Sequence, residues 1–405
     1  MEVSEEKEKY ILVIAYSGEE EAADASLDEL SELLATAEGA AVGRMKQKLP
    51  HPDPATYIGS GKAAELKLLM ELDGADAVVC DDELSPAQMR NLSDLLDAKV
   101  IDRTMLILDI FAAHAHTSEG KLQVETAQLK YRISHLTGAG KAMSRLGGGI
   151  GTRGPGETKL ETDRRVIAKR LSRLSSEIKD MQRVRMTTRK KRMGNRTPVI
   201  AIVGYTNAGK STLLNCLTQA QVLSEDKLFA TLDPTTRSCT MKGGQEVLFT
   251  DTVGFIQKLP HQLIDAFRST LEEAKYADVI LHVTDASDPA LDMHMSVVYD
   301  TLRELGIEGK PVITAFNKTD LPGGGERLRD ERADAYTKIS AKTGAGIEQL
   351  LTLIGDLLQK SRRYVDQVIP YSEGNKLAAI RKYGQVLGEE YLEDGIRIRA
   401  YVPYL

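Results

Sequence analysis

Hydrophobic and polar positions alternate along the first 116 residues in blocks that predict strands and helices in turn. Apolar runs of strand length occur at residues 10–15 and 77–80, Lys-Val-Ile-Asp at 99–102 is a further predicted strand, and a strand-like stretch lies near Ala41. Helical patterns occur at residues 26–34, 61–72 and 85–96, the last with Ser85 and Pro86 at its start. This alternation predicts a small α/β domain with a largely parallel sheet.

Two longer helical patterns follow this domain. Their apolar residues recur at alternating spacings of four and three, which is a heptad-like period. The first stripe is Leu122, Thr126, Leu129, Ile133 and Leu136, and the second is Ile167, Leu171, Leu174, Ile178 and Met181. Because each stripe needs a partner, we predict an antiparallel helical hairpin in which the two stripes bury each other.

The segment between these helices, residues 137–156, is rich in glycine. Eight of its twenty residues are glycine, and it also carries Lys141, Arg145 and Arg153. Glycine has too much conformational freedom for a packed element, so we predict a long basic loop at the tip of the hairpin. The alternative is a linker without a function, since long loops are commonly one or the other.

A strand-like run at residues 199–203 leads into a phosphate-binding motif. The motif has the form G-x-x-x-x-G-K-[ST] and consists of Gly204, Tyr205, Thr206, Asn207, Ala208, Gly209, Lys210 and Ser211, with Thr212 opening the helix that follows. Glycines let backbone N–H groups surround an anion, the lysine reaches the β- and γ-phosphates, and the serine hydroxyl binds Mg²⁺. The motif predicts a nucleotide hydrolase.

Two further segments have the chemistry of a γ-phosphate and magnesium site. Asp251, Thr252, Val253 and Gly254 follow a strand-like run at residues 246–250. Asp251 suits a water-mediated Mg²⁺ contact, and Gly254 can offer its N–H to the γ-phosphate. The second segment comprises Phe229, Ala230, Thr231, Leu232 and Asp233. We expect Thr231 to close over Mg²⁺, so Lys210, Thr231 and Gly254 are the predicted catalytic residues.

Two segments nearer the C-terminus predict which nucleotide base is bound. Asn317, Lys318, Thr319 and Asp320 follow an apolar run at residues 312–316. The Asp320 carboxylate can accept hydrogen bonds from N1–H and the 2-amino group of guanine, a donor pair that adenine lacks. The backbone of Ser340, Ala341 and Lys342 can meet the guanine O6. All four segments together resemble the motifs of the translation-factor-related GTPases and favour GTP over ATP.

Phe255 occupies the position at which many GTPases carry a glutamine that orients the attacking water. Phenylalanine cannot orient water, so we predict slow hydrolysis by the isolated protein and stimulation by a partner. The alternative is that Gln257 replaces the missing glutamine. Asn207 also has two interpretations. Its side-chain amide binds K⁺ beside the phosphates, or it only stabilises the loop through a hydrogen bond of its own.

Residues 57–62, Tyr-Ile-Gly-Ser-Gly-Lys, resemble a phosphate loop only superficially, because the four-residue spacing is missing. We interpret them as a tight turn before a helix, with binding of RNA or of a nucleotide as the alternative.

Composition and charge narrow the class of protein. No apolar run is long enough for a membrane span, and the acidic start of the chain is unlike a signal peptide. The three cysteines lack metal-binding spacing. We therefore expect a cytoplasmic monomer; partial association with ribosomes is implied only by the family resemblance described below. The net charge is −6, yet residues 164–196 carry +11, which leaves −17 for the rest. Such a basic arm suits a polyanionic partner.

These patterns predict four domains. They are an N-terminal α/β domain at residues 1–116, a basic hairpin at 117–196, a GTPase domain with a mostly parallel sheet at 197–360 and a small α+β module at 361–405. Within the hairpin we expect residues 187–196 to form a linker. In the C-terminal module we expect a short helix at 377–382 and a strand at 395–402.

Residues 148–165 carry a distinctive run: Gly-Gly-Ile-Gly-Thr-Arg-Gly-Pro-Gly-Glu-Thr-Lys-Leu-Glu, followed after one residue by Asp-Arg-Arg. This run, the phosphate loop, the segment at 229–234 and Asp-Thr-Val-Gly-Phe resemble the HflX family of GTPases. The resemblance implies a GTPase that needs Mg²⁺, binds the large ribosomal subunit and its rRNA and, in some members, splits stalled ribosomes. It also implies that the hairpin tip approaches the peptidyl transferase region.

The basic residues nearest this signature are the expected RNA contacts. They are Lys141, Arg145, Arg153, Arg164, Arg165, Lys169, Arg170 and Arg173. The basic segment contains no aromatic residue, which favours recognition of backbone and shape over base stacking. Two alternatives stay open: a GTPase of ribosome assembly or RNA modification, and a scaffold whose hairpin binds a protein or an anionic membrane.

Overall fold

The computed structural model describes residues 7–136, 155–194, 197–218, 228–229, 235–241, 244–260, 273–322, 328–360 and 362–403. Contacts divide the chain into two compact units. The first consists of Met1–Asp180 with Lys258–Ala266, and the second consists of Met181–Gln257 with Phe267–Leu405.

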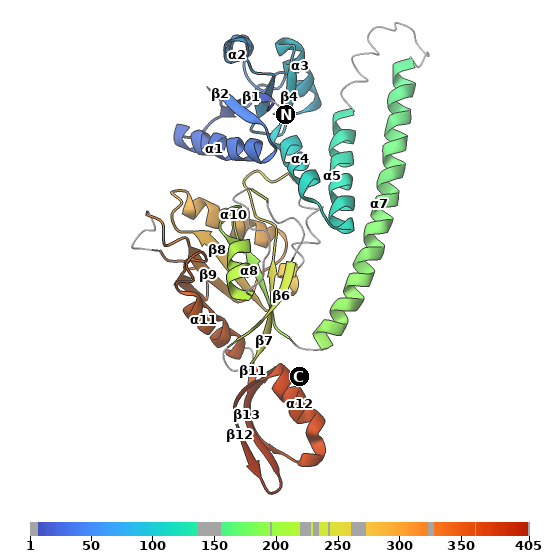
Figure 1. Cartoon of the computed structure of the whole chain (residues 1–405). Helices are drawn as coiled ribbons and strands as arrows, with labels where there is room; N and C mark the ends of the chain where they lie inside the picture. The colour runs from blue at the N-terminus through green and yellow to red at the C-terminus, as the bar shows by residue number, and fades with distance from the viewer. Residues whose placement is uncertain are drawn as a thin grey trace, which may run out of the picture. The chain divides into compact units, whose positions relative to one another are not determined.

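The first unit contains a four-stranded parallel sheet with the strand order β2-β1-β3-β4 (Figure 1). Its elements are β1 (Lys9–Tyr16), α1 (Glu20–Thr36), β2 (Ala40–Lys48), α2 (Ser60–Asp73), β3 (Ala77–Cys80), α3 (Pro86–Leu96), β4 (Lys99–Asp102) and α4 (Arg103–His114). The predicted α/β alternation is confirmed. Ile11 and Val13 of β1 point to a buried cluster that includes Leu66 of α2 and Leu92 of α3.

Two polar residues cap the N-terminal ends of helices that flank this sheet. Ser85 caps α3 in a capping box with Gln88, and Pro86 occupies the first turn, as the sequence predicts. Asp102 ends β4 and caps α4, because its carboxylate accepts a hydrogen bond from the Met105 N–H at 2.8 Å. The stretch that only superficially resembles a phosphate loop forms a turn at Tyr57, and α2 begins at Ser60. The segment therefore has the conformation of the predicted tight turn before a helix.

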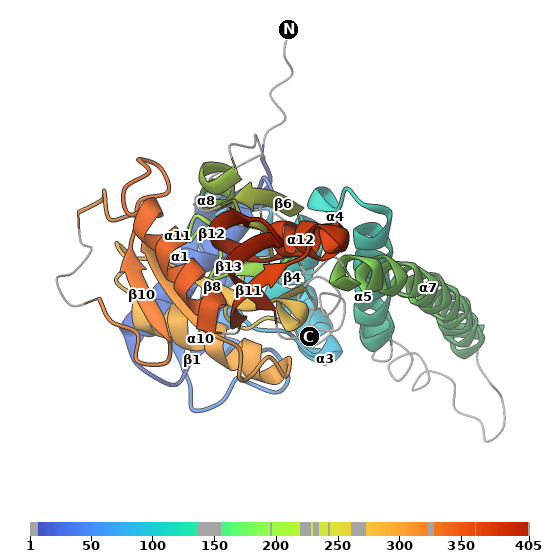
Figure 2. The ribbon, with the colours of Figure 1, turned by 90° about the horizontal axis from the view of Figure 1, so that it is seen from below.

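The helical hairpin consists of α5 (Ser118–Leu136) and α7 (Pro155–Gly194), which lie side by side in both views (Figure 1 and Figure 2). Arg170 of α7 makes a two-pronged ion pair with Glu125 of α5, with N–O distances of 2.7 and 2.8 Å. In the predicted stripe of α7, Leu174 is fully buried.

Two hairpin predictions need correction. The most buried positions of α5 are not the predicted stripe but another face, which includes Val124, Ala127 and Tyr131. This face packs towards α4, and the Tyr131 hydroxyl donates to Asp102 at 2.9 Å. The predicted linker at 187–196 is also wrong, since α7 continues to Gly194. Lysine, arginine and methionine are good helix formers, so the charge of this segment does not end the helix.

The second unit holds a six-stranded sheet with the order β10-β9-β8-β5-β7-β6, in which only the edge strand β6 runs antiparallel. Its described elements are β5 (Val199–Val203), α8 (Lys210–Thr218), β6 (Thr235–Thr240), β7 (Glu246–Asp251), β8 (Val279–Asp285), α10 (Leu291–Glu304), β9 (Val312–Asn317), β10 (Ala335–Lys338) and α11 (Ile347–Lys360). Alternate residues of β5, β8 and β9 join one buried cluster with α8 and α11. The predicted mostly parallel sheet is confirmed.

The C-terminal residues of the second unit form a small α+β module, as predicted. Its antiparallel sheet has the order β11-β13-β12, and α12 packs against it. The elements are β11 (Arg362–Ile369), a 3₁₀ turn (Tyr371–Glu373), α12 (Gly374–Tyr383), β12 (Gln385–Leu392) and β13 (Gly395–Pro403). Leu377, Ile380 and Ile398 are at the centre of its core.

Candidate nucleotide-binding site

The phosphate loop connects β5 to α8, and its two glycines are required by close contacts. A Cβ on Gly204 would lie 2.2 Å from the Val283 carbonyl oxygen. Gly209 has φ of +90°, and a Cβ there would lie 2.3 Å from Nδ2 of Asn317. Any larger residue would therefore push the loop away from β8 and β9, where it must sit to meet a nucleotide.

Lys210 lies at the start of α8 and is almost completely buried. Its ammonium group donates a hydrogen bond to the Tyr205 carbonyl oxygen at 2.7 Å. Burial lowers the pKa of Lys210 to about 8, and the negative charge of Asp251 partly opposes this shift. A phosphate group would favour the charged form, so this lysine is suited to bind an anion.

Ser211 and Asp251 provide the oxygen atoms expected of a magnesium site. The Ser211 hydroxyl donates to the Asp251 carboxylate at 2.8 Å, and Asp251 is fully buried at the end of β7. Mg²⁺ prefers such oxygen ligands together with water and phosphate oxygens, so these two residues fit the ion. Thr231, with Ala230, Leu232 and Asp233, lies outside the described residues.

The segment after Asp251 is hydrogen-bonded to the phosphate loop. The Thr206 N–H donates to the Phe255 carbonyl at 2.8 Å, and the Phe255 N–H donates to the Gly204 carbonyl at 3.1 Å. A Cβ on Gly254 would lie 2.8 Å from the Thr206 side chain and 3.0 Å from Nζ of Lys210. Gly254 therefore lies directly beside Lys210, the lysine that was predicted to bind phosphate.

Phe255 and Gln257 differ in where their side chains go. Phe255 is only 2% exposed, so it is a packed residue and has no group that could orient water. The Gln257 side chain donates to the sulfur of Met293 in α10 at 3.4 Å, and its backbone N–H donates to the Tyr205 hydroxyl at 2.9 Å. These contacts direct Gln257 towards α10 and disfavour it as a replacement for the missing glutamine.

Asn317 connects the phosphate loop to the predicted guanine segments. Its Nδ2 donates to the Ala208 carbonyl at 2.8 Å, and its Oδ1 accepts from the Ala341 N–H at 2.9 Å. Asn317 is 2% exposed. A single buried amide therefore holds together the loop that was predicted to meet the phosphates and the loop that was predicted to meet the base.

The Asp320 carboxylate is exposed near this bridge. A hydrogen bond from Ser340 lowers its pKa, and the positive charges of Lys342 and Lys318 act in the same direction. Asp320 is therefore held as a carboxylate, which is the form that accepts hydrogen bonds from guanine. Lys318 has φ of +61°, and its ammonium group pairs with Asp285 at 2.7 Å. That pair fixes the turn that presents Asp320.

His294 and its partner Asp288 were not foreseen from the sequence. His294 of α10 stacks on the ring of Tyr205, with ring centroids 3.7 Å apart, and pairs with Asp288 at 3.0 Å. The motif pattern treats Tyr205 as a variable position, so it gave no signal for a partner. Asn207 has φ of +59° and an exposed side chain. Asparagine tolerates this conformation well, and K⁺ binding by Asn207 stays a prediction.

The predicted RNA contacts fall into three groups. Lys141, Arg145 and Arg153 lie outside the described residues. Arg164, Arg165, Lys169 and Arg173 are exposed on α7. Arg170 is half-buried and engaged with Glu125, so its contact in the structure is within the hairpin. Sequence reasoning did not detect this ion pair, because it depends on how the two helices align.

The parallel sheet, the phosphate loop, the Ser211–Asp251 pair and the Asn317 bridge together define a P-loop GTPase. Three family models match the chain: "GTP-binding GTPase N-terminal" over residues 24–112, "GTP-binding GTPase Middle Region" over 114–192 and "50S ribosome-binding GTPase" over 199–318.

Relatives identify the family. A protein of Lacrimispora saccharolytica named GTPase HflX is 57% identical over 404 residues, covering 100% of this chain and 95% of that protein. The GTPase HflX of Escherichia coli K12 is 39% identical, covering 92% of this chain and 88% of that protein. The chain belongs to the HflX family, as the sequence motifs indicate, and it is a GTPase that binds guanine nucleotides and hydrolyses GTP.

A solved structure of a GTP-binding protein of Sulfolobus solfataricus with GDP is 24% identical. The match covers 87% of this chain and 99% of the chain in that structure, with a TM-score of 0.46. Within the described ranges, no helix combines the length and the apolar character needed to cross a membrane.

Proposed function

We propose that this GTPase associates with the large ribosomal subunit and uses GTP to split or rescue stalled ribosomes. The observation that carries the proposal is the basic face of α7, in a chain whose GTPase domain matches a family described as 50S ribosome-binding. The helix spans 40 residues, which corresponds to roughly 60 Å at 1.5 Å per residue. That length suits an arm that reaches along RNA.

The charges on α7 support rRNA as the partner. Arg164, Arg165, Lys169 and Arg173 are exposed, whereas the apolar stripe around Leu174 is turned inward. Exposed cations bind RNA mainly by releasing counterions from phosphates, and such binding weakens steeply with salt. Ile167, Leu171, Ile178 and Met181 are partly buried beside it, and a helix whose apolar stripe packs inward is poorly suited to lie in a membrane surface.

Hydrolysis is proposed to be slow until the subunit binds. Phe255 is packed and cannot orient water, so the missing function has to come from elsewhere. Ser211 and Thr231 would hold Mg²⁺ directly, and Asp251 would contact it through water. When bound, Mg²⁺ neutralises charge that develops on the phosphates. In this proposal Lys210 and the Gly254 N–H hold the γ-phosphate.

The test is a charge-neutralised triple variant, with Arg164, Arg165 and Lys169 changed to glutamine. We expect its affinity for purified large subunits to fall about 10- to 1,000-fold, with a shallower dependence on salt. The matched control replaces three exposed basic residues of the second unit, Arg303, Arg329 and Lys376, and should bind normally. Equal binding and equal salt slopes for both variants would reject α7 as the RNA contact.

A further inference from the structure

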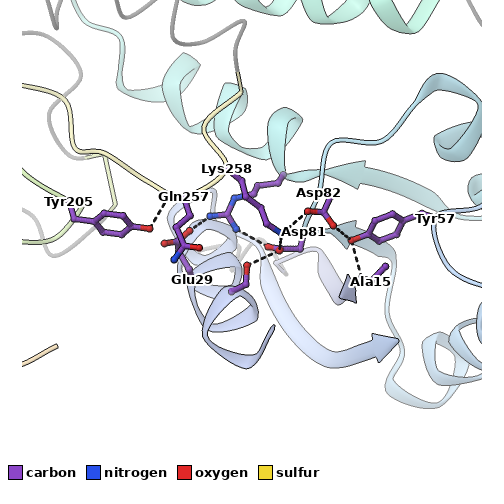
Figure 3. Close-up of polar contacts among 10 residues, drawn as sticks. Ala15, Glu29, Tyr57, Asp81, Asp82, Tyr205, Gln257 and Lys258 are labelled. Atoms are coloured by element: carbon purple, nitrogen blue, oxygen red, sulfur yellow. Dashed lines mark hydrogen bonds and ion pairs between the residues drawn. The ribbon is translucent and has the colours of Figure 1, made fainter. Parts of the chain in front are cut away.

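Tyr205, the second residue of the phosphate loop, is 6% exposed although it carries a polar hydroxyl group. The hydroxyl accepts a hydrogen bond from the backbone N–H of Gln257 at 2.9 Å, and Figure 3 shows it directed at that residue. Because the bond is made to the main chain, it fixes the course of the chain at residue 257 whatever side chain lies there. Tyr205 therefore joins the phosphate loop to a point three residues after Gly254.

The backbone of Phe255 also pairs with the phosphate loop. Phe255 forms an isolated parallel bridge with Tyr205, outside the named strands. Its carbonyl accepts from the Thr206 N–H at 2.8 Å, and its N–H donates to the Gly204 carbonyl at 3.1 Å. The hydrogen bond between Tyr205 and Gln257 continues this pairing beyond Phe255.

The Tyr205 ring is itself held in place by α10. It lies nearly parallel to the ring of His294, with centroids 3.7 Å apart and an angle of 13° between the planes. Nδ1 of His294 is 3.0 Å from one carboxylate oxygen of Asp288, and the other oxygen accepts from the Ala290 N–H at 2.8 Å. The hydrogen bond from His294 lowers the pKa of Asp288, so Asp288 stays a carboxylate and Nδ1 is the donor. The turn before α10 thus fixes the His294 ring.

Gln257 reaches the same end of α10 directly. Its side chain donates to the sulfur of Met293, the residue before His294, at 3.4 Å. The start of α10 therefore contacts residue 257 both through Met293 and through the stack of His294 on Tyr205. All of these residues belong to the second unit of the chain.

A fixed backbone near Gly254 matters for the chemistry of GTP hydrolysis. Charge is spread over the γ-phosphate oxygens in the transition state, and donors that are already in place stabilise this charge without further ordering. A loose segment would have to be ordered first, at a cost in conformational entropy. GDP lacks the γ-phosphate, so its binding does not depend on this segment.

We propose that His294 is a positioning residue for GTP hydrolysis. Its ring holds the Tyr205 hydroxyl in place, and that hydroxyl holds the Gln257 N–H. The backbone that carries Gly254 is thereby restricted before GTP is hydrolysed. The proposal rests on the proposed bond between the Gly254 N–H and the γ-phosphate, but it concerns the isolated protein and is independent of binding to the ribosome.

The test measures single-turnover hydrolysis at saturating GTP by full-length Tyr205→Phe and His294→Ala. We expect Tyr205→Phe to lower the rate about 2- to 10-fold, the range that loss of one hydrogen bond accounts for. His294→Ala should lower it by a factor no larger than this, and both variants should keep the normal affinity for GDP. The matched control Tyr371→Phe removes a tyrosine hydroxyl that donates to the Leu392 carbonyl at 2.9 Å in the C-terminal module, and it should hydrolyse GTP at the normal rate.

A double variant and a conservative substitution separate positioning from general packing. Tyr205→Phe combined with His294→Ala should be no slower than Tyr205→Phe alone, because both substitutions act through one hydroxyl group. His294→Phe keeps a stacked ring and should retain most of the rate. If urea unfolding shows His294→Ala to be unstable, His294→Gln, which has no ring, replaces it.

Unchanged or faster hydrolysis by stable His294→Ala overturns the proposal, as do effects of the two substitutions that simply multiply. A GDP affinity that falls in step with the rate also overturns it, because the phosphate loop would then be damaged as a whole. Gly254→Pro, which lacks the N–H, tests the underlying contact. Normal hydrolysis by Gly254→Pro removes that contact and the proposal with it, whereas slow hydrolysis by Gly254→Pro beside normal hydrolysis by His294→Ala removes only the role of His294.

Discussion

Replacing Asn317 with alanine removes two buried hydrogen bonds that hold the nucleotide site together. The Ala208 carbonyl and the Ala341 N–H lose their partners at 2.8 and 2.9 Å. A buried polar group without a partner costs about 1–3 kcal/mol. Since water can reach one or both groups after the truncation, we expect the free energy of unfolding to fall by about 2–4 kcal/mol rather than by the full sum.

The same substitution should also weaken nucleotide binding, because it separates the phosphate loop from the loop at Ala341. We expect the affinities for GTP and GDP to fall together by about 10- to 100-fold, which corresponds to about 1.4–2.8 kcal/mol. The measurements are urea unfolding and equilibrium titration with a fluorescent guanine nucleotide. Asn91→Ala, which removes one exposed bond to Ala55, is the matched control. Near-normal nucleotide affinity and stability of Asn317→Ala would refute the claim that the Asn317 amide holds the two loops together.

Three further predictions concern single ionisable groups. Asp320→Asn should weaken GTP binding at least about 100-fold and improve binding of xanthosine triphosphate, whose C2 oxygen accepts from the new amide; unchanged base preference in competition titrations would contradict this. The affinity for GTP should not change with pH below pH 8 and should fall by up to about tenfold per pH unit above it. The reason is that Lys210 has a pKa of about 8 and must regain a proton to bind phosphate. A GTP affinity that stays constant up to pH 10 would contradict this role of Lys210. Burial lowers the pKa of His282 to about 4, so between pH 6.5 and 4 this residue takes up a proton when the protein unfolds. The free energy of unfolding should therefore fall by up to about 3 kcal/mol as the pH falls through that window. His282→Leu should flatten that part of the urea-unfolding profile.

The sequence predicts the strands and the nucleotide motifs well because both depend on local patterns. A continuous apolar run marks β3, the segment Lys-Val-Ile-Asp marks β4, both with the observed bounds, and the phosphate loop follows its strand as expected. Where packing decides, prediction fails. The heptad-like pattern of α5 indicates one face, but contact with α4 buries Val124 and Ala127 on another.

The least predictable features join residues that are far apart in sequence. Asn317 is expected next to a base, yet its amide bonds to Ala208 and Ala341. Lys258 carries no motif signal at all, because its partners Asp81 and Asp82 follow a strand of the first domain. Such pairs depend on strand order and on the exact exit of each strand, which a local pattern does not specify.

We propose that this protein attaches to the large ribosomal subunit and that the bound guanine nucleotide controls the attachment. The most direct measurement is sucrose-gradient co-sedimentation with ribosomes and separated subunits in a non-hydrolysable GTP analogue, in GDP and without nucleotide. A variant lacking residues 137–156 serves as the control. We predict retention on the large subunit with the GTP analogue and weak retention with GDP or with the deletion variant. Absence from every ribosomal particle in all three states would contradict the account, and binding only to precursor particles would favour a role in assembly.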